Sequence, residues 1–317
     1  MNTSLKDCII RGSAAGEKMV FNIPPGRFSG SRGVSTGYSA GNSLEFMEHR
    51  DYFPGDDLRS IDWNVYARTD RLAVKVFHNE VTPALDIVID TSGSMNHSGT
   101  PKGGAAAGLA AMLASAAGNS SYRYKTRLCG EHGFDLLEMG AEVPSLWGEF
   151  EFGGNFSPAD VLEQYMPPFP PHGVRVFISD LLFCSEPGRF LSLFSAGASA
   201  VIILQVLALE DINPSLRGNI QVTDSETGES IEVFADSSLL KEYRRRVEAH
   251  CQAWYAASKD AGVFFTTAVA EDFSGKWLGL KDFESAASSA EMNGGGFVSS
   301  AGCAVEELVR KEVLRIL

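Results

Sequence analysis

An alternating set of oxygen-bearing side chains follows an apolar run near residue 90. The run Ile-Val-Ile at 87–89 leads into Asp90, and Ser92 and Ser94 follow at every second position. An uninterrupted apolar run before a Gly/Ser turn is typical of a buried parallel strand, and ligands bind beyond the carboxyl ends of such strands. A carboxylate and two hydroxyls are hard donors that suit Mg²⁺, Mn²⁺ or Ca²⁺. The same residues equally predict an acid-serine turn that caps the next helix.

A second apolar run ends in the same way. Residues 173–182 read GVRVFISDLL, so that Ser179 and Asp180 close a predicted strand. The carboxyl ends of adjacent parallel strands meet at one edge of a sheet. We therefore expect Asp180 to share a cation site with Asp90.

Strand and helix patterns alternate through most of the chain. Apolar runs predict strands at 122–129, 133–137, 200–206 and 262–268, and helical periodicity predicts helices at 103–121, 189–196 and 239–257. Ser157 before Pro158 is a typical N-cap of a further helix. The turn sequence DSETGE indicates a hairpin between 218–222 and 230–233. Together these patterns predict an α/β fold with a central, mostly parallel sheet and helices on both faces.

The charge of the chain argues against nucleic acid as its main partner. The 317 residues carry a formal net charge of −13, whereas phosphate binding needs a basic surface. Residues 1–80 hold ten Lys/Arg and ten Asp/Glu, so all of the acidic excess lies beyond residue 80. A neutral first segment and an acidic remainder favour a protein partner or a cation.

Cysteine spacing and hydropathy predict a cytoplasmic protein. The five cysteines, at 8, 129, 184, 251 and 303, form neither a CxxC nor a Cys/His motif, which favours free thiols in a reducing compartment. Cys184 follows the apolar run 181–183 and is expected to be an inert core thiol. The N-terminus lacks the apolar core of a signal peptide, and the longest apolar run, at 198–209, is too short for a transmembrane segment.

Composition also divides the chain. Residues 1–42 are rich in Gly and Ser and are predicted to form a flexible arm. Residues 43–82 mix aromatic and charged side chains, which suggests a partly buried ion-pair network that docks this extension on the core. Within it, 61–66 and 72–76 alternate as strands do. Residues 83–273 form the α/β core, and 274–317 are an irregular tail that ends in an amphipathic helix at 304–317.

Two stretches resemble known families. The run DTSGSM after an apolar strand is similar to the metal-ion-dependent adhesion site (MIDAS) of von Willebrand factor type A domains, D-x-S-x-S. The preceding segment LEFMEHRDYFPGDDLRSIDWNVYARTDRLAVKVF resembles the signature of the bacterial family named domain of unknown function 58, and the similarity extends over about residues 27–270. The signature positions are Arg50, Tyr52, Gly55, Asp56, Asp57, Arg59, Asp62, Trp63 and Arg68.

The resemblance implies a von Willebrand A-like, Rossmann-like fold with Mg²⁺, or Mn²⁺ or Ca²⁺, at the carboxyl edge of the sheet. Carried over by position, Asp90, Ser92, Ser94 and Asp180 would be metal ligands, the last through water. The family's threonine after two glycines is replaced by Asn155, and Ser157 is a substitute ligand nearby. One coordination position would stay open for a carboxylate of the partner.

The resemblance further implies a function. The chain looks like the short form of the family without membrane helices, which is associated with AAA+ ATPases of the MoxR type in the assembly or activation of other proteins. We expect a non-enzymatic protein-interaction module that uses a divalent cation. The alternatives are a metal-dependent hydrolase or phosphatase, and a scaffold whose site binds no metal. Against the phosphatase, Asp90 is followed by TSGSM and has no second acid two residues on.

Overall fold

The chain folds as two compact units. The computed structural model describes residues 4–23, 46–77, 83–99, 101–137, 143–224, 228–274 and 304–317. Unit 1 comprises residues 1–32 and 83–317, and unit 2 comprises residues 33–82.

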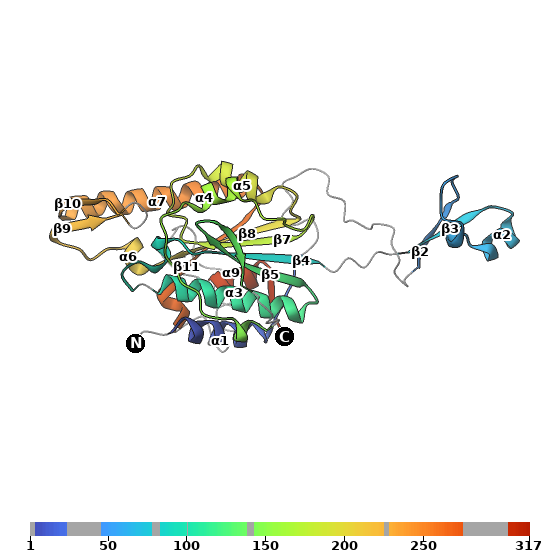
Figure 1. Cartoon of the computed structure of the whole chain (residues 1–317), viewed down its shortest axis with the longest axis horizontal. Coiled ribbons are helices and arrows are strands. Elements are labelled where there is room, and N and C mark those ends of the chain that lie inside the picture. The colour runs from blue at the N-terminus through green and yellow to red at the C-terminus, as the bar shows by residue number, and fades with distance from the viewer. Residues whose placement is uncertain are drawn as a thin grey trace. The chain divides into compact units, whose positions relative to one another are not determined.

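Unit 1 is built around a six-stranded sheet of mixed but mostly parallel strands (Figure 1). Within this sheet only β6 runs antiparallel to its neighbour. The predicted α/β fold with a mostly parallel sheet is therefore confirmed. The direction in which the chain adds strands reverses at β4. Strands β5 and β6 lie on one side of β4, and the later strands β7, β8 and β11 lie on the other. Open parallel sheets bind ligands at such a switch point. Across the sheet the strands are β11 (Phe264–Val269), β8 (Ala200–Leu207), β7 (Val174–Ser179), β4 (Ala84–Asp90), β5 (Arg123–Gly130) and β6 (Gly133–Leu136).

Alternate residues of the buried strands pack on opposite faces of the sheet. In β4, Ile87 and Ile89 belong to one core cluster and Val88 to the other. The first cluster is covered by α1 (Leu5–Gly16), α3 (Lys102–Asn119) and α9 (Ala304–Arg310). The second is covered by α4 (Pro158–Gln164), α5 (Pro187–Ser195) and α7 (Ser237–Asp260), which Figure 1 shows on the opposite side. The predicted helices on both faces are thus confirmed.

Shorter elements connect these layers. The predicted hairpin is present as β9 (Gly218–Thr223) and β10 (Ser230–Ala235), which pair antiparallel. Helix α6 (Leu209–Ile212) follows β8 and places Asp211 beside the sheet edge. Among its described residues, unit 1 also has three 3-10 turns: η2 (Gly93–Gly99), η3 (Pro144–Leu146) and η4 (Ala270–Ser274). A further 3-10 turn, η1 (Leu58–Ser60), belongs to unit 2.

The prediction of a flexible arm over 1–42 is wrong for the part that the structure describes, 4–23. Ser4 caps helix α1, and Cys8, Ile9 and Ala15 are buried in the core. Gly12 contacts α3 so closely that a Cβ atom there would lie 2.0 Å from the carbonyl oxygen of Gly108. The glycine at position 12, which contributed to the prediction of a flexible arm, therefore allows the backbones of α1 and α3 to pack directly against each other. Residues 24–42 lie outside the described residues.

The C-terminal segment also differs from the prediction. The expected helix at 304–317 ends at Arg310, where Glu312 adopts a left-handed conformation with φ 60°. The chain then forms β12 (Leu314–Ile316), which pairs antiparallel with β1 (Met19–Phe21). Residues 4–23 and 304–317 are therefore packed parts of unit 1 rather than appendages of a core at 83–273. Residues 275–303 lie outside the described residues.

Unit 2 is a small hairpin with one helix. Strands β2 (Phe46–Asp51) and β3 (Ala73–Phe77) pair antiparallel, and α2 (Trp63–Thr69) lies in the segment that connects them. The expectation of strand-like alternation at 61–66 is wrong, because the carboxylate of Asp62 accepts hydrogen bonds from the backbone N–H groups of residues 64 and 65 and starts the helix. Docking of this unit on the core remains a prediction.

Most signature residues of unit 2 form its turns and caps. Arg50 and Asp56 pair at 2.8 Å, and Asp56 also accepts from the Phe53 N–H to close a turn in which Gly55 has φ +111°. Asp57 caps η1 by accepting a hydrogen bond from the N–H of Arg59. The Tyr52 N–H donates to the Leu72 carbonyl. In α2, Trp63 packs edge-on against Tyr66, and Arg68 lies in the last turn.

A hydrogen bond with His49 lowers the pKa of Asp62 to about 2. Lys75 adds to this charge pairing at 3.5 Å. The signature therefore specifies the shape of this unit, with the buried Asp62 at its centre.

No helix within the described part of the chain has the length and apolar character needed to span a bilayer.

Candidate functional site

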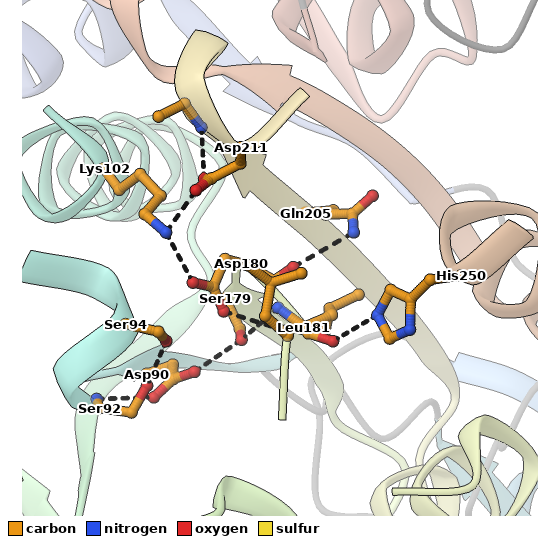
Figure 2. Close-up of polar contacts among 12 residues, drawn as sticks. Asp90, Ser92, Ser94, Lys102, Ser179, Asp180, Leu181, Gln205, Asp211 and His250 are labelled. Carbon is orange, nitrogen blue, oxygen red and sulfur yellow. Dashed lines mark hydrogen bonds and ion pairs between the residues drawn. The ribbon is translucent and has the colours of Figure 1, made fainter. Parts of the chain in front are cut away.

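The loop after β4 brings the three oxygen-bearing side chains of the motif together. Asp90 is fully buried, and its two carboxylate oxygens accept hydrogen bonds from the Ser92 N–H at 2.8 Å and from the Ser179 hydroxyl at 2.6 Å. The hydroxyls of Ser92 and Ser94 lie 3.1 Å apart (Figure 2). Ser179 therefore links the ends of β4 and β7 directly, as expected for adjacent parallel strands, and a cation site shared by Asp90 and Asp180 stays a prediction.

Burial makes the carboxyl group of Asp90 a weaker acid than usual. Loss of solvation, with a further contribution from the negative charge of Asp180, raises the pKa of Asp90 from 3.8 to about 7. The hydrogen bonds from Ser179 and Ser92 act in the opposite direction but do not cancel this effect. A positive charge placed beside this buried carboxylate would stabilise its ionised form.

Asp180 has a positively charged partner within the protein. Its Oδ2 accepts from the Lys102 ammonium at 2.8 Å, and its Oδ1 accepts from the Leu182 N–H at 3.1 Å. Lys102 also pairs with Asp211 at 3.0 Å, and its side chain is only 2% exposed. Burial alone would lower the pKa of Lys102, but the two carboxylates outweigh it and raise the pKa above its usual value. The ammonium is therefore a permanent cation of the site.

A glycine turn lies against the motif loop. The Gly153 N–H donates to the Thr91 carbonyl at 2.8 Å, and the Gly93 N–H donates to the Gly154 carbonyl at 3.2 Å. These bonds place Asn155 next to the loop, where its side chain is exposed.

Ser157 begins α4 as predicted, but its hydroxyl does not cap the helix. The Ser157 Oγ is instead buried without a hydrogen-bond partner. An orphaned buried hydroxyl of this kind is a candidate ligand for a cation, which favours Ser157 over Asn155.

The turn after Asp180 is fixed from two sides. Leu181 adopts a left-handed conformation with φ 58°, and its carbonyl oxygen lies 2.7 Å from the Nε2 atom of His250 on α7. Gln205 of β8 donates to the Asp180 carbonyl at 3.2 Å. Figure 2 shows these side chains converging on the turn from different elements. The acid is thus held in place by its backbone as well as by its side chain.

The donor set fits a divalent cation of the magnesium type. Ligands of Mg²⁺ lie 2.0–2.1 Å from the metal, so adjacent ligands are roughly 2.9 Å apart. The 3.1 Å separation of the Ser92 and Ser94 hydroxyls is close to that value. Within the described ranges no three His, Cys, Asp or Glu side chains are grouped as a metal site, so a cation bound here would need hydroxyl oxygens among its ligands. Asp90, Ser92 and Ser94 would hold the ion, and Ser157 is a further candidate ligand.

Sequence reasoning missed Lys102 and Asp211. Lys102 is the only charged residue of α3, whose remaining residues are almost all small or apolar. A single charge in a helix that is buried on most sides must find a partner, and this was the available signal. Cys184 also departs from expectation, because it is exposed rather than part of the core.

Comparison with known proteins bears on the family. Residues 48–135, which include the unit 2 signature and the motif loop, match the sequence model of a family described as "Protein of unknown function DUF58". The match supports the DUF58 family. Uncharacterized protein Mb1516 of Mycobacterium bovis and uncharacterized protein Rv1480 of Mycobacterium tuberculosis are each 27% identical over 234 residues, which cover 69% of this chain and 72% of theirs.

Two solved structures are similar to parts of the chain. A conserved hypothetical protein, BatB of Bacteroides thetaiotaomicron, is 13% identical and covers 65% of this chain and 100% of its own, with a TM-score of 0.34. An aerotolerance-related membrane protein of Bacteroides fragilis, solved with multiple mutations to serine, is 14% identical and covers 56% of this chain and 98% of its own, with a TM-score of 0.29.

Proposed function

We propose that the chain is a non-enzymatic interaction module with a von Willebrand A-like core, which grips a protein partner through a divalent cation. The observation that carries this proposal is the buried Asp90 beside the paired hydroxyls of Ser92 and Ser94. When bound, Mg²⁺ would accept one external carboxylate and so convert an acidic surface into a binding site for acids.

The protein's own residues prepare the site for such an ion. Ser179 orients the carboxylate of Asp90, and the Ser92 N–H holds its other oxygen. The raised pKa of Asp90 means that a proton takes the place of the missing positive charge near pH 7. Cation binding would release this proton, so the affinity for Mg²⁺ should rise with pH through about 7.

Calorimetric titration with Mg²⁺ and Mn²⁺ tests the first half of the proposal. We expect saturable binding by the wild-type chain and none by Asp90→Ala, with Asp135→Ala as a matched control on the exposed end of β6. Binding that persists in Asp90→Ala would contradict the assignment. Hydrolysis of a generic phosphate or ester substrate that is lost in Asp90→Ala would instead support the metal-dependent hydrolase.

The proposed partner is a MoxR-type AAA+ ATPase, and this rests on the family resemblance alone. The test is co-elution of the full-length chain with a purified ATPase of that type, in Mg²⁺ and in chelator. Retention in Mg²⁺ that is lost in chelator and in Asp90→Ala would support the proposal. Equal retention in both buffers would refute a role for the cation.

The Lys102–Asp180 pair favours a second candidate, a scaffold without metal. In that case the buried ammonium, 2.8 Å from Asp180, would already supply the positive charge that this edge of the sheet needs. A chain that captures its partner but binds neither Mg²⁺ nor Mn²⁺ in calorimetry would identify this candidate as the correct one.

A further inference from the structure

The buried side chains at the carboxyl edge of the sheet carry a definite charge. Asp90 and Asp180 are fully buried, Asp211 is 20% exposed, and Lys102 pairs with the last two at 2.8 and 3.0 Å. With every group ionised, these three carboxylates and one ammonium leave two negative charges, which equal the charge of one divalent cation. Without Lys102 the site would carry three.

We infer that Lys102 is a positioning residue that sets the charge preference of the cation site, so that the site takes a divalent rather than a trivalent ion. This inference rests on the proposed function. A buried site binds best the ion whose charge it balances, because uncompensated charge is costly away from water. Lys102 is fixed in the chain and cannot exchange with ions in solution, so it acts as a permanent part of that balance.

The same residue joins three elements around the site. Lys102 lies at the first position of α3, Asp180 directly follows β7, and Asp211 lies in α6 after β8. Asp211 also accepts from the Ala208 N–H at 2.9 Å, and its carbonyl accepts from the Tyr243 hydroxyl of α7. In Figure 2 the ammonium lies between the two carboxylates. The arrangement fixes Asp180 whether or not a metal is present.

Two substitutions shift the charge in opposite directions. Asp211→Asn removes one negative charge and keeps an oxygen that can accept from the Ala208 N–H. Lys102→Gln removes the positive charge, and the double variant Lys102→Gln/Asp211→Asn returns the site to its original charge. Glu210→Gln is the matched control, because Glu210 is the exposed neighbour of Asp211 and loses the same charge without facing Lys102.

The experiment measures association constants of the full chain for Mg²⁺ and Tb³⁺ by calorimetry at pH 8. At an effective dielectric constant near 20 to 40 and a separation of about 7 Å, one unit of charge within the site should change the Tb³⁺/Mg²⁺ ratio by roughly 7- to 60-fold. The ratio should fall in Asp211→Asn, rise in Lys102→Gln, and return to within about twofold of wild type in the double variant. Circular dichroism and thermal unfolding check that each variant is folded.

Each outcome decides a different point. If the wild-type chain binds neither ion, the cation site of the proposed function is wrong and this inference falls with it. If the wild-type chain binds Mg²⁺ but Lys102→Gln and Asp211→Asn both behave like Glu210→Gln, only the role of Lys102 is refuted. If Lys102→Gln does not fold, Asp211→Asn and the double variant still measure the charge preference.

Discussion

Replacing Asp90 by Asn should stabilise the chain when no metal is present. The pKa of Asp90 is raised from 3.8 to about 7 in the folded state, whereas in the unfolded chain it returns to its ordinary value. Below about pH 4 both states hold the proton, so the carboxyl group makes no difference to stability. Between about pH 4 and 7 only the folded state keeps the proton, and the free energy of unfolding falls as pH rises.

The magnitude follows from the size of the shift. One pKa unit corresponds to 1.36 kcal/mol, so a shift of roughly three units costs the wild-type chain at most about 4 kcal/mol above pH 7. Asn does not titrate, and its amide can serve the same neighbours, the Ser92 N–H and the Ser179 hydroxyl. The stabilisation of Asp90→Asn over wild type should therefore grow from near zero at pH 4 to a few kcal/mol at pH 8.

Urea unfolding in chelator across pH 4–8 measures this difference through the midpoint and the slope. The control is Asp135→Asn, an exposed acid on β6 whose effect should stay small at every pH. Saturating Mg²⁺ should stabilise wild type, by about 2.7 kcal/mol at a hundredfold excess over Kd, and leave Asp90→Asn unchanged. A difference that is independent of pH, or a variant less stable than wild type at pH 8, would refute the reasoning.

Three further predictions concern other parts of the chain. Gly12→Ala should lower the free energy of unfolding by about 1–3 kcal/mol in thermal or urea unfolding, because its Cβ would collide with the Gly108 carbonyl, whereas Gly148→Ala, with open space around it, should be near neutral. Ser157→Ala should raise the free energy of unfolding in chelator by about 1 kcal/mol, since it removes a buried hydroxyl without a partner, and should lower the affinity for Mg²⁺; a loss of stability in chelator would contradict this. Asp62 has a lowered pKa, so the stability that it gives unit 2 is present above about pH 4 and is lost as pH falls towards 2. Asp62→Ala should remove this pH dependence and speed amide exchange at the start of α2. Unchanged exchange there would show that the cap is dispensable.

The meeting of Asp90 with the end of β7 was predictable because it depends only on strand direction. Parallel strands place their carboxyl ends at one edge, and the apolar runs before residues 90 and 180 mark both strands clearly. The pairing of Lys102 with Asp180 was not predictable in this way. It depends on how close the start of α3 comes to β7, and no local pattern encodes that distance.

The two ends of unit 1 show the same limit. Helix α1 is 12 residues long and carries Gly12 inside it, so its own propensity is weak, and it is stabilised by a contact with α3 that no local pattern reveals. Strand β12 is three residues long, and only its pairing with β1 defines it as a strand. Elements that owe their structure to distant partners escape prediction from local composition.

The pairing of β1 with β12 also has a consequence for how the chain acquires its fold. Met19 pairs with Ile316, so strands separated by roughly 300 positions must meet, and contacts of such long range slow folding. During synthesis β1 has no partner strand until residues 314–316 leave the ribosome. Because the apolar residues Val305, Leu308 and Leu314 are fully buried, a ribosome that stalls before residue 304 leaves the surface that covers them exposed. Synthesis of residues 304–316 is thus the step that completes this part of the core.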